Sequence, residues 1–127
     1  MHLRYLNVSF TALNVLPPEL FSLAWLTHLD VSGNPLRLLA PDIVQLTELT
    51  FLNVSGTHLT VLPPELFTLT HLTHLNVSEN QLALLPPAIG QLTQLQWLYV
   101  HDNAFRILPS EVNQLTQVQN SFSLPVR

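Results

Sequence analysis

The chain has 127 residues, the size of one domain, and only 9% of them are charged. Its net charge of −4, with four scattered arginines and no lysine, argues against binding to nucleic acid or to anionic membrane surfaces. No apolar run is long enough to insert into a membrane, and the absence of cysteine excludes disulfides, thiolate metal sites and cysteine catalysis.

Leucine recurs at every 23rd residue from Leu3 and divides the chain into similar units. The units of this single domain are residues 3–25, 26–48, 49–71, 72–94 and 95–117, and residues 118–127 form a partial sixth unit or lid. We number the positions of each unit from 1 to 23. Apolar residues occupy positions 1, 4, 6, 11, 14, 18 and 21 of all five units, and position 6 is always valine.

Each unit begins with a predicted strand. Positions 3 to 7 alternate outward and inward around a leucine and a valine, which is the period of a half-buried strand. Because every unit supplies this strand at the same place, the strands are expected to stack in parallel. Position 9 follows, where Asn34, Asn80 and Asn103 are predicted to hydrogen-bond loop backbone of neighbouring units, with Thr11 and Thr57 in the other two units.

The second half of each unit predicts a short helix. Positions 15 and 16 are rich in proline, which suits a first helical turn, and a carboxylate follows in four units. The apolar residues at positions 18 and 21 give this helix one buried side. A helix of one or two turns, α or 3₁₀, is therefore expected. Phe21 and Phe67 at position 19 are expected either on the convex surface or tucked between helices.

The units L-x-x-L-x-L-x-x-N-x-L followed by LPxxIxxL resemble leucine-rich repeats of the 23-residue, intracellular Ras-group-like type, found in Scribble- and Erbin-like scaffolds and in bacterial proteins. The resemblance covers about residues 3–117. It implies an α/β leucine-rich-repeat solenoid, a right-handed horseshoe arc with a parallel β-sheet on the concave face and short helical or 3₁₀ segments on the convex face. This sequence departs from the family by its threonines at position 9 and by the lack of a recognisable cap.

The pair His71 and His74 suggests a metal site, but residues three apart in extended chain point to opposite faces. We therefore expect no metal and no cofactor. The N-x-S triplets at Asn7, Asn53 and Asn76 all fall at positions 5 and 7, so they are one repeated feature. We interpret them as an Asn and Ser ladder on the exposed sheet face rather than as glycosylation sites.

Ser78, His101 and Asp102 are the residue types of a catalytic triad. Ser78 and His101 share position 7 in adjacent units, so their side chains are expected to be neighbours. Asp102 directly follows His101 and is expected to point elsewhere, without the buried acid that a triad needs. The sequence therefore predicts no enzyme.

The outward strand positions carry large rings that folding does not require. Position 3 forms an aromatic and imidazole column, and exposed aromatic residues are typical interface anchors. The predicted partner-binding residues are Tyr5, His28, Phe51, His74, Trp97, Tyr99, His101, Asp102, Glu79, Asp30, Asn53 and Asn76. The alternative interpretation is cross-strand packing that only supports the sheet.

The ends of the solenoid predict self-association or membership of a larger protein. Leu3, Leu6 and Val8 are expected to be unshielded on one side. At the other end, Val118, Phe122 and Leu124 are expected to fold over the last unit as a lid.

The expected function is a non-enzymatic module that binds a protein or peptide partner on its concave face. A cytoplasmic location is expected because no apolar signal segment follows Met1. Three alternatives stay open: the recognition part of a larger effector or ligase, a secreted pattern-recognition module, and a designed consensus repeat protein without a natural ligand.

Overall fold

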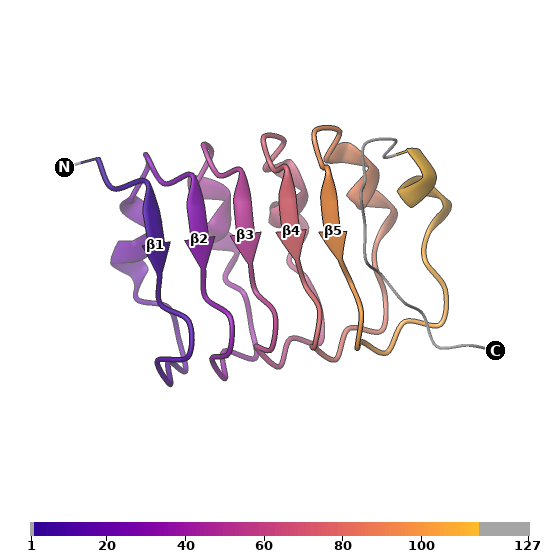
Figure 1. The fold of residues 1–127 in the computed structure, drawn as a ribbon, viewed down its shortest axis with the longest axis horizontal. Helices are drawn as coiled ribbons and strands as arrows, with labels where there is room; N and C mark the ends of the chain where they lie inside the picture. The colour runs from indigo at the N-terminus through magenta and orange to yellow at the C-terminus, as the bar shows by residue number, and fades with distance from the viewer. Residues whose placement is uncertain (1, 115–127) are drawn as a thin grey trace.

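The computed structural model describes residues 2–114, and in this part of the chain short strands alternate with 3₁₀ helices. The strands are β1 (Tyr5–Asn7), β2 (His28–Asp30), β3 (Phe51–Asn53), β4 (His74–Asn76) and β5 (Trp97–Tyr99). The helices are η1 (Pro18–Ser22), η2 (Pro41–Gln45), η3 (Pro64–Thr68), η4 (Pro87–Gln91) and η5 (Ser110–Gln114). The strands stand side by side in one parallel sheet of order β1-β2-β3-β4-β5, with the helices behind it (Figure 1). Each repeat is thus one coil of a solenoid, as predicted.

The register of the sheet pairs residues that lie 23 apart, such as Leu6 with Leu29 and Leu29 with Leu52. Every repeat position therefore forms a column that crosses all coils. The position-4 leucines of β2 to β5 are fully buried between the sheet and the helices, and positions 3 and 5 point away from them. The repeated apolar positions form one continuous core.

Each strand is shorter than predicted, spanning positions 3 to 5 instead of 3 to 7. A turn follows each strand, and at position 8 the backbone has a positive φ in every coil. The residues are Phe10 (53°), Gly33 (69°), Gly56 (62°), Glu79 (57°) and Asp102 (56°). Glycine adopts this conformation without strain. At Gly33 a Cβ atom would also fall on the ring of Phe10, 2.6 Å from its Cζ, so a larger residue there would have to displace this exposed ring.

The helices are short 3₁₀ helices of five residues, of which η1 to η4 begin at proline and η5 begins directly after Pro109. In the first coil Leu20 N donates to Pro17 O (3.0 Å) and Leu23 N donates to Leu20 O (3.1 Å), the three-residue spacing of a 3₁₀ helix. The prediction of a short helix with one buried side is confirmed. Phe21 and Phe67 are buried in the core, so the expected convex patch of phenylalanines is wrong and the alternative of tucked side chains is right.

Asparagine at position 9 joins neighbouring coils, as predicted. The Asn80 side chain accepts from Thr57 N (2.9 Å) and Leu59 N (3.0 Å) of the preceding coil. Its Nδ2 donates back to Val54 O (3.1 Å) and to Val77 O of its own coil (3.0 Å). Thr57 fits beside it because its hydroxyl donates to Val54 O of its own coil (2.6 Å).

The two ends of the chain differ in what the structure describes. Leu3, Leu6 and Val8 of the first coil are half-buried, in line with their predicted position at an open end. The predicted lid of Val118, Phe122 and Leu124 lies outside the described residues. Between residues 2 and 114, no helix has the length and hydropathy needed to cross a bilayer.

Candidate interaction surface on the sheet

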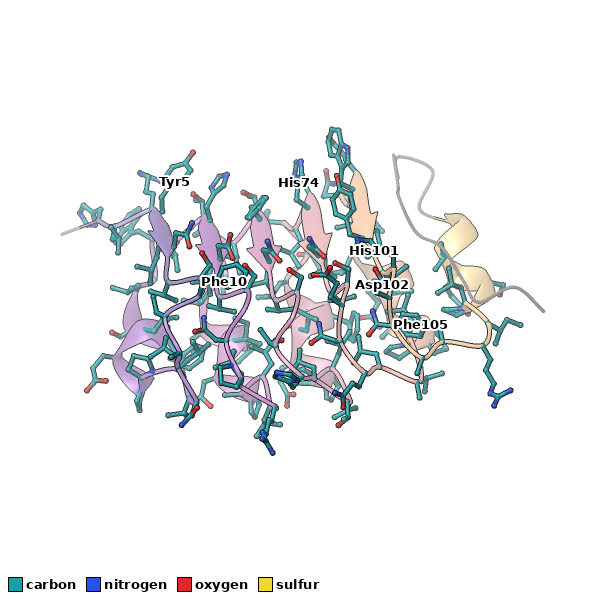
Figure 2. All side chains as sticks on the ribbon, turned by 60° about the horizontal axis from the view of Figure 1, so that its bottom comes forward. Tyr5, Phe10, His74, His101, Asp102 and Phe105 are labelled. Atoms are coloured by element: carbon teal, nitrogen blue, oxygen red, sulfur yellow. The ribbon has the colours of Figure 1, made fainter. Side chains whose placement is uncertain are left out.

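The position-3 side chains stack into a continuous column, which we call the ring ladder. It consists of Tyr5, His28, Phe51, His74 and Trp97. Successive ring centroids are 4.1, 5.5, 5.7 and 4.4 Å apart, and the rings are nearly parallel except for the tilted pair of Phe51 and His74. Figure 2 shows Tyr5 and His74 projecting from the same side of the sheet, away from the helices. The column arises because the parallel register places position 3 of each coil beside the next.

Stacking hides the ring faces and leaves the ring edges outward. His28, Phe51, His74 and Trp97 are half-buried, and Tyr5 at one end is 66% exposed. The cross-strand packing that the sequence left open is therefore present. It does not remove the surface, because the ring edges still form a continuous strip that is assembled without a partner.

The two histidines of the ladder are held by the threonines that precede them. Thr27 Oγ1 lies 3.0 Å from His28 Nδ1, and Thr73 Oγ1 lies 2.9 Å from His74 Nδ1. Each hydroxyl also lies within hydrogen-bond distance of a backbone carbonyl of the preceding coil, at 3.2 Å for Thr27 and 3.1 Å for Thr73. The tautomer of each ring decides whether Nδ1 or the hydroxyl donates in the contact between them. Burial, and secondly the nearby His28, lowers the pKa of His74 below 6.5.

Position 5 shapes the turn after each strand. Asn53 Oδ1 accepts from Ser55 N (3.0 Å), and Asn76 Oδ1 accepts from Ser78 N (3.0 Å). The predicted Asn and Ser ladder exists, but its exposure was wrong at two serines. Ser32 and Ser78 are buried, because their hydroxyls turn back onto the position-5 side chains Asp30 and Asn76.

Two polar residues directly after β5, His101 and Asp102, contact each other. His101 Nδ1 lies 2.8 Å from Asp102 Oδ2, so the expectation that Asp102 points elsewhere is wrong. The left-handed backbone at Asp102 turns its side chain back toward its neighbour. Asp102 is exposed rather than buried, and the Ser78 hydroxyl donates to Asn76 rather than to His101. This geometry is that of an exposed hydrogen-bonded pair and not of a triad.

The side chains of His71 and His74, the pair that suggested a metal site, have different surroundings. His71 Nδ1 lies 3.1 Å from Thr47 O in the preceding coil, whereas His74 belongs to the ring ladder. Within residues 2–114 no three His, Asp or Glu side chains group closely enough to hold a metal ion.

The predicted partner-binding residues occupy the outward positions of the strands and the turns that directly follow them, a region that we call the sheet face. It comprises positions 3, 5, 7 and 8 of each coil. The ring ladder, Asp30, Asn53, Asn76 and Tyr99 stand on the strands, and His101, Glu79 and Asp102 follow directly after them. The structure thus arranges these residues in adjacent columns across all five coils. Asn53 and Asn76 have one side-chain oxygen committed to the turns, and Tyr99 replaces them in the fifth coil.

Position 13 forms a second column that the sequence interpretation missed. This aliphatic row consists of Val15, Leu38, Val61, Leu84 and Ile107, whose exposed fractions lie between 61% and 72%. The available signal was an aliphatic residue at position 13 in every unit, but it stands next to the core leucine of position 14. An apolar hollow of about 230 Å³ lies beside this row, and its lining includes Val61, Leu84 and Phe67.

Known proteins resemble this chain in sequence and fold. The family model described as "Leucine rich repeat" matches residues 1–59 and 47–105. A leucine-rich repeat protein of Leptospira interrogans is 39% identical with a TM-score of 0.87, over 94% of this chain and 30% of that chain. The functional domain of InlJ from Listeria monocytogenes is 25% identical with a TM-score of 0.80, over 96% of this chain and 25% of that one. Internalin C2 of the same organism is 26% identical with a TM-score of 0.70, over 82% of this chain and 47% of its own.

No curated protein matches the chain. The chain spans less than a third of the length of the first two solved structures named above.

Proposed function

Because the chain belongs to the leucine-rich repeat family, we propose that it is a non-enzymatic interaction module that binds a protein or peptide on its sheet face. The family fold is generally used for protein interaction. The observation that carries the choice of face is the ring ladder, five stacked rings whose edges point away from the core. A preformed surface loses little conformational entropy on binding, so its contacts contribute to affinity more fully.

The centre of the proposed contact is the C-terminal part of the sheet face. Trp97 stacks on His74 at 4.4 Å, and Tyr99 stands two residues further along the same strand. Tryptophan and tyrosine are the residue types that most often dominate binding energy. His101 and Asp102 provide a polar rim beside them.

The test uses peptides selected from a displayed random library on the full chain. Binding of these peptides is then measured for Trp97→Ala and Tyr99→Ala, with Trp25→Ala as the matched control. Trp25 is also a partly exposed tryptophan, but it contacts His2 and Arg4 rather than the ring ladder. We expect Trp97→Ala and Tyr99→Ala to abolish binding and Trp25→Ala to retain it.

Thermal unfolding accompanies this test, because Trp97 also packs within the ladder. Loss of one stacked aromatic pair costs about 1 kcal/mol, which a folded chain tolerates. Peptides that still bind Trp97→Ala and Tyr99→Ala with full affinity would contradict the proposal. Unfolding of these variants would instead support a ladder that only packs the sheet.

Self-association through the first coil is a second proposal. An apolar hollow of about 470 Å³ opens on this coil, lined by residues that include Leu6, Val8, Leu13 and Leu20. A second copy that covers it would bury these side chains. Light scattering at high protein concentration is expected to show dimers, and a strict monomer would contradict this second proposal.

A further inference from the structure

Position 5 of the second coil carries a charge that the fold does not use. In the first, third and fourth coils, the side chains of Asn7, Asn53 and Asn76 cap the turn by accepting from the backbone N–H two residues ahead, at 2.9 to 3.0 Å. Asp30 does the same for Ser32 at 3.0 Å. Since a neutral amide is sufficient for this turn in three coils, the negative charge of Asp30 is an addition to the repeat.

The carboxylate of Asp30 also has an oxygen to spare. Its bonds to Ser32 N and to the Ser32 hydroxyl both use Oδ1. Oδ2 accepts no hydrogen bond and joins no ion pair within the described chain. A half-buried carboxylate oxygen in this state is a strong acceptor for a charged donor.

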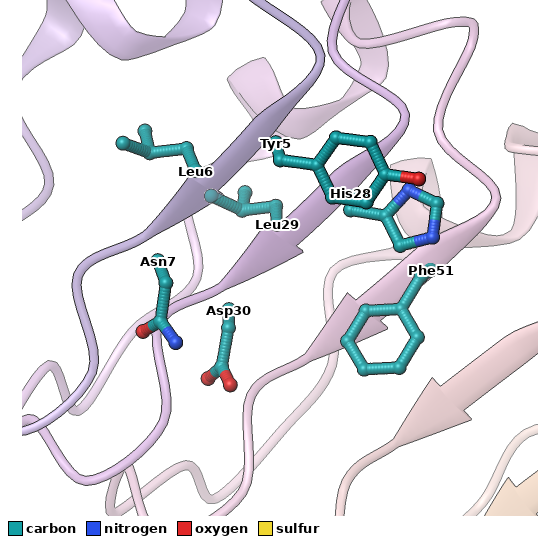
Figure 3. A pocket seen from close by; sticks show the side chains of 7 residues that line it. All are labelled: Tyr5, Leu6, Asn7, His28, Leu29, Asp30 and Phe51. Atoms are coloured by element: carbon teal, nitrogen blue, oxygen red, sulfur yellow. The ribbon is translucent and has the colours of Figure 1, made fainter.

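Asp30 lines a pocket on the sheet face together with part of the ring ladder. The pocket holds about 370 Å³ and is lined by Tyr5, Leu6, Asn7, His28, Leu29, Asp30 and Phe51. Figure 3 shows the rings of Tyr5 and His28 together at one end of this group and the side chains of Asp30 and Asn7 side by side at the other. The ring of Tyr5 stacks on His28 with one face only, and no other ring in residues 2–114 covers its second face.

The permanent charges of the sheet face are of one sign. Asp30 stands on β2, and Glu79 and Asp102 follow β4 and β5. The described arginines are placed elsewhere in the repeat. The guanidinium of Arg4 lies 5.9 Å from the Trp25 ring centre, Arg37 lines a hollow with His58 and Gln81, and Arg106 shares position 12 with Arg37. The face therefore attracts a partner of positive charge.

We propose that the pocket formed by Tyr5, His28, Asp30 and Phe51 binds an arginine side chain of the partner. A guanidinium is flat, pairs with a carboxylate through a planar fork of N–H groups and is weakly hydrated, so it fits a carboxylate that stands beside a wall of aromatic ring edges. Lysine matches only the carboxylate, because its ammonium is a compact charge with a strong hydration shell. This inference rests on the proposed function and specifies its partner: a basic segment anchored by arginine at β1 to β3, with aromatic contacts toward β5.

The test titrates the full chain with the peptide acetyl-Gly-Ala-Arg-Ala-Gly-amide and follows backbone amide signals by NMR. The control peptide has citrulline, which has the shape of arginine without its charge. We expect saturable shifts at Tyr5, His28 and Asp30 with a Kd on the order of millimolar. Citrulline is expected to bind about tenfold more weakly, and a lysine peptide to bind between the two, since one charge-assisted hydrogen bond is worth about this factor.

The variant Asp30→Asn separates charge from structure, because asparagine caps the same turn in three other coils. It is expected to keep the unfolding midpoint and to lose about tenfold in affinity for the arginine peptide. Asp42→Asn removes the same charge on η2, away from the sheet, and is expected to leave the affinity for the arginine peptide unchanged. Equal binding of the arginine and citrulline peptides, no saturable shift, or unchanged affinity in Asp30→Asn would each overturn the proposal.

The peptides selected on the whole chain distinguish this proposal from the more general one. Selected peptides that need Trp97 but are indifferent to Asp30→Asn leave the binding face in place and overturn the arginine site alone. Selected peptides that ignore Trp97 and Tyr99, combined with charge-dependent binding of the arginine peptide, overturn the general proposal and retain the pocket.

Discussion

A single repeat position gives different side chains different environments, and His74 illustrates this at the scale of the residue. It occupies the same position as Tyr5 and Phe51, but its ring can take up a proton, and it lies between two aromatic rings, Phe51 at 5.7 Å and Trp97 at 4.4 Å. His28 holds the equivalent place two coils earlier. A proton on His74 is therefore disfavoured by burial first and by the second imidazole after it.

This lowered pKa predicts a dependence of stability on pH. Because the pKa of His74 is below 6.5 in the folded chain, the unfolded chain binds its proton more readily. The contribution of His74 to the free energy of unfolding is therefore intact above pH 6.5 and falls as the pH drops from there to the folded pKa. We expect the urea midpoint to fall between pH 7.5 and pH 5.5, and to fall less in His74→Phe, which keeps a ring in the ladder.

The matched control for His74 is His71→Gln. His71 is exposed in the preceding loop, and its substitution is expected to leave the pH profile as in the wild type. A His74→Phe profile identical to that of the wild type would contradict the assigned cause. An NMR titration adds a direct reading, in which His28→Phe should raise the pKa of His74 because it removes the second imidazole.

At the scale of the element, each coil is too small to have its own core. A strand of three residues and a 3₁₀ turn of five bury their apolar side chains only against neighbouring coils. The asparagines of position 9 add polar contacts to this stacking, because each satisfies backbone groups of two coils at once. Asn80 is buried and bonded to the third coil from both ends of its amide, whereas Asn103 is only half-buried.

This difference predicts unequal effects of one substitution. Asn80→Ala leaves the N–H groups of Thr57 and Leu59 without their acceptor in a buried loop, and should lower the free energy of unfolding by about 3 kcal/mol or more. The Oδ1 of Asn103 accepts from Leu82 N in a partly exposed place, so Asn103→Ala should cost less. Urea unfolding of both variants measures the difference. A larger cost for Asn103→Ala would refute this account of the coil interface.

At the scale of the whole molecule, stacking converts repeat positions into surfaces as long as the solenoid. Position 3 becomes the ring ladder on the sheet face, and position 13 becomes the aliphatic row. Neighbouring positions 13 and 14 have opposite fates. Leu84 is 66% exposed, whereas Leu85 is fully buried in the core.

The paired leucines give a direct check of this arrangement. Leu85→Gln places an amide among core side chains and should cost about 3 kcal/mol of stability, whereas Leu84→Gln should change it by less than about 0.5 kcal/mol. Thermal and urea unfolding of the two variants test the contrast. Equal losses would mean that the aliphatic row is packed rather than exposed.

The sequence alone determined the architecture, because a 23-residue period copies each residue's environment from coil to coil. The parallel stack, the buried positions, a short helix at the prolines and the inter-coil role of Asn80 all follow from that copying. The outward direction of the side chains at positions 3 and 5 followed from the alternation of the strand.

Only the tertiary structure decided what lies next to what across the coils. It showed that the rings of position 3 stack face to face, that Ser78 is buried, and that Asp102 bonds to His101. It also showed that the strands end at position 5, ahead of a left-handed residue at position 8, and that Leu84 faces solvent beside a buried Leu85. The physical reason is that these properties depend on side-chain directions and backbone dihedrals, which a period in sequence does not specify.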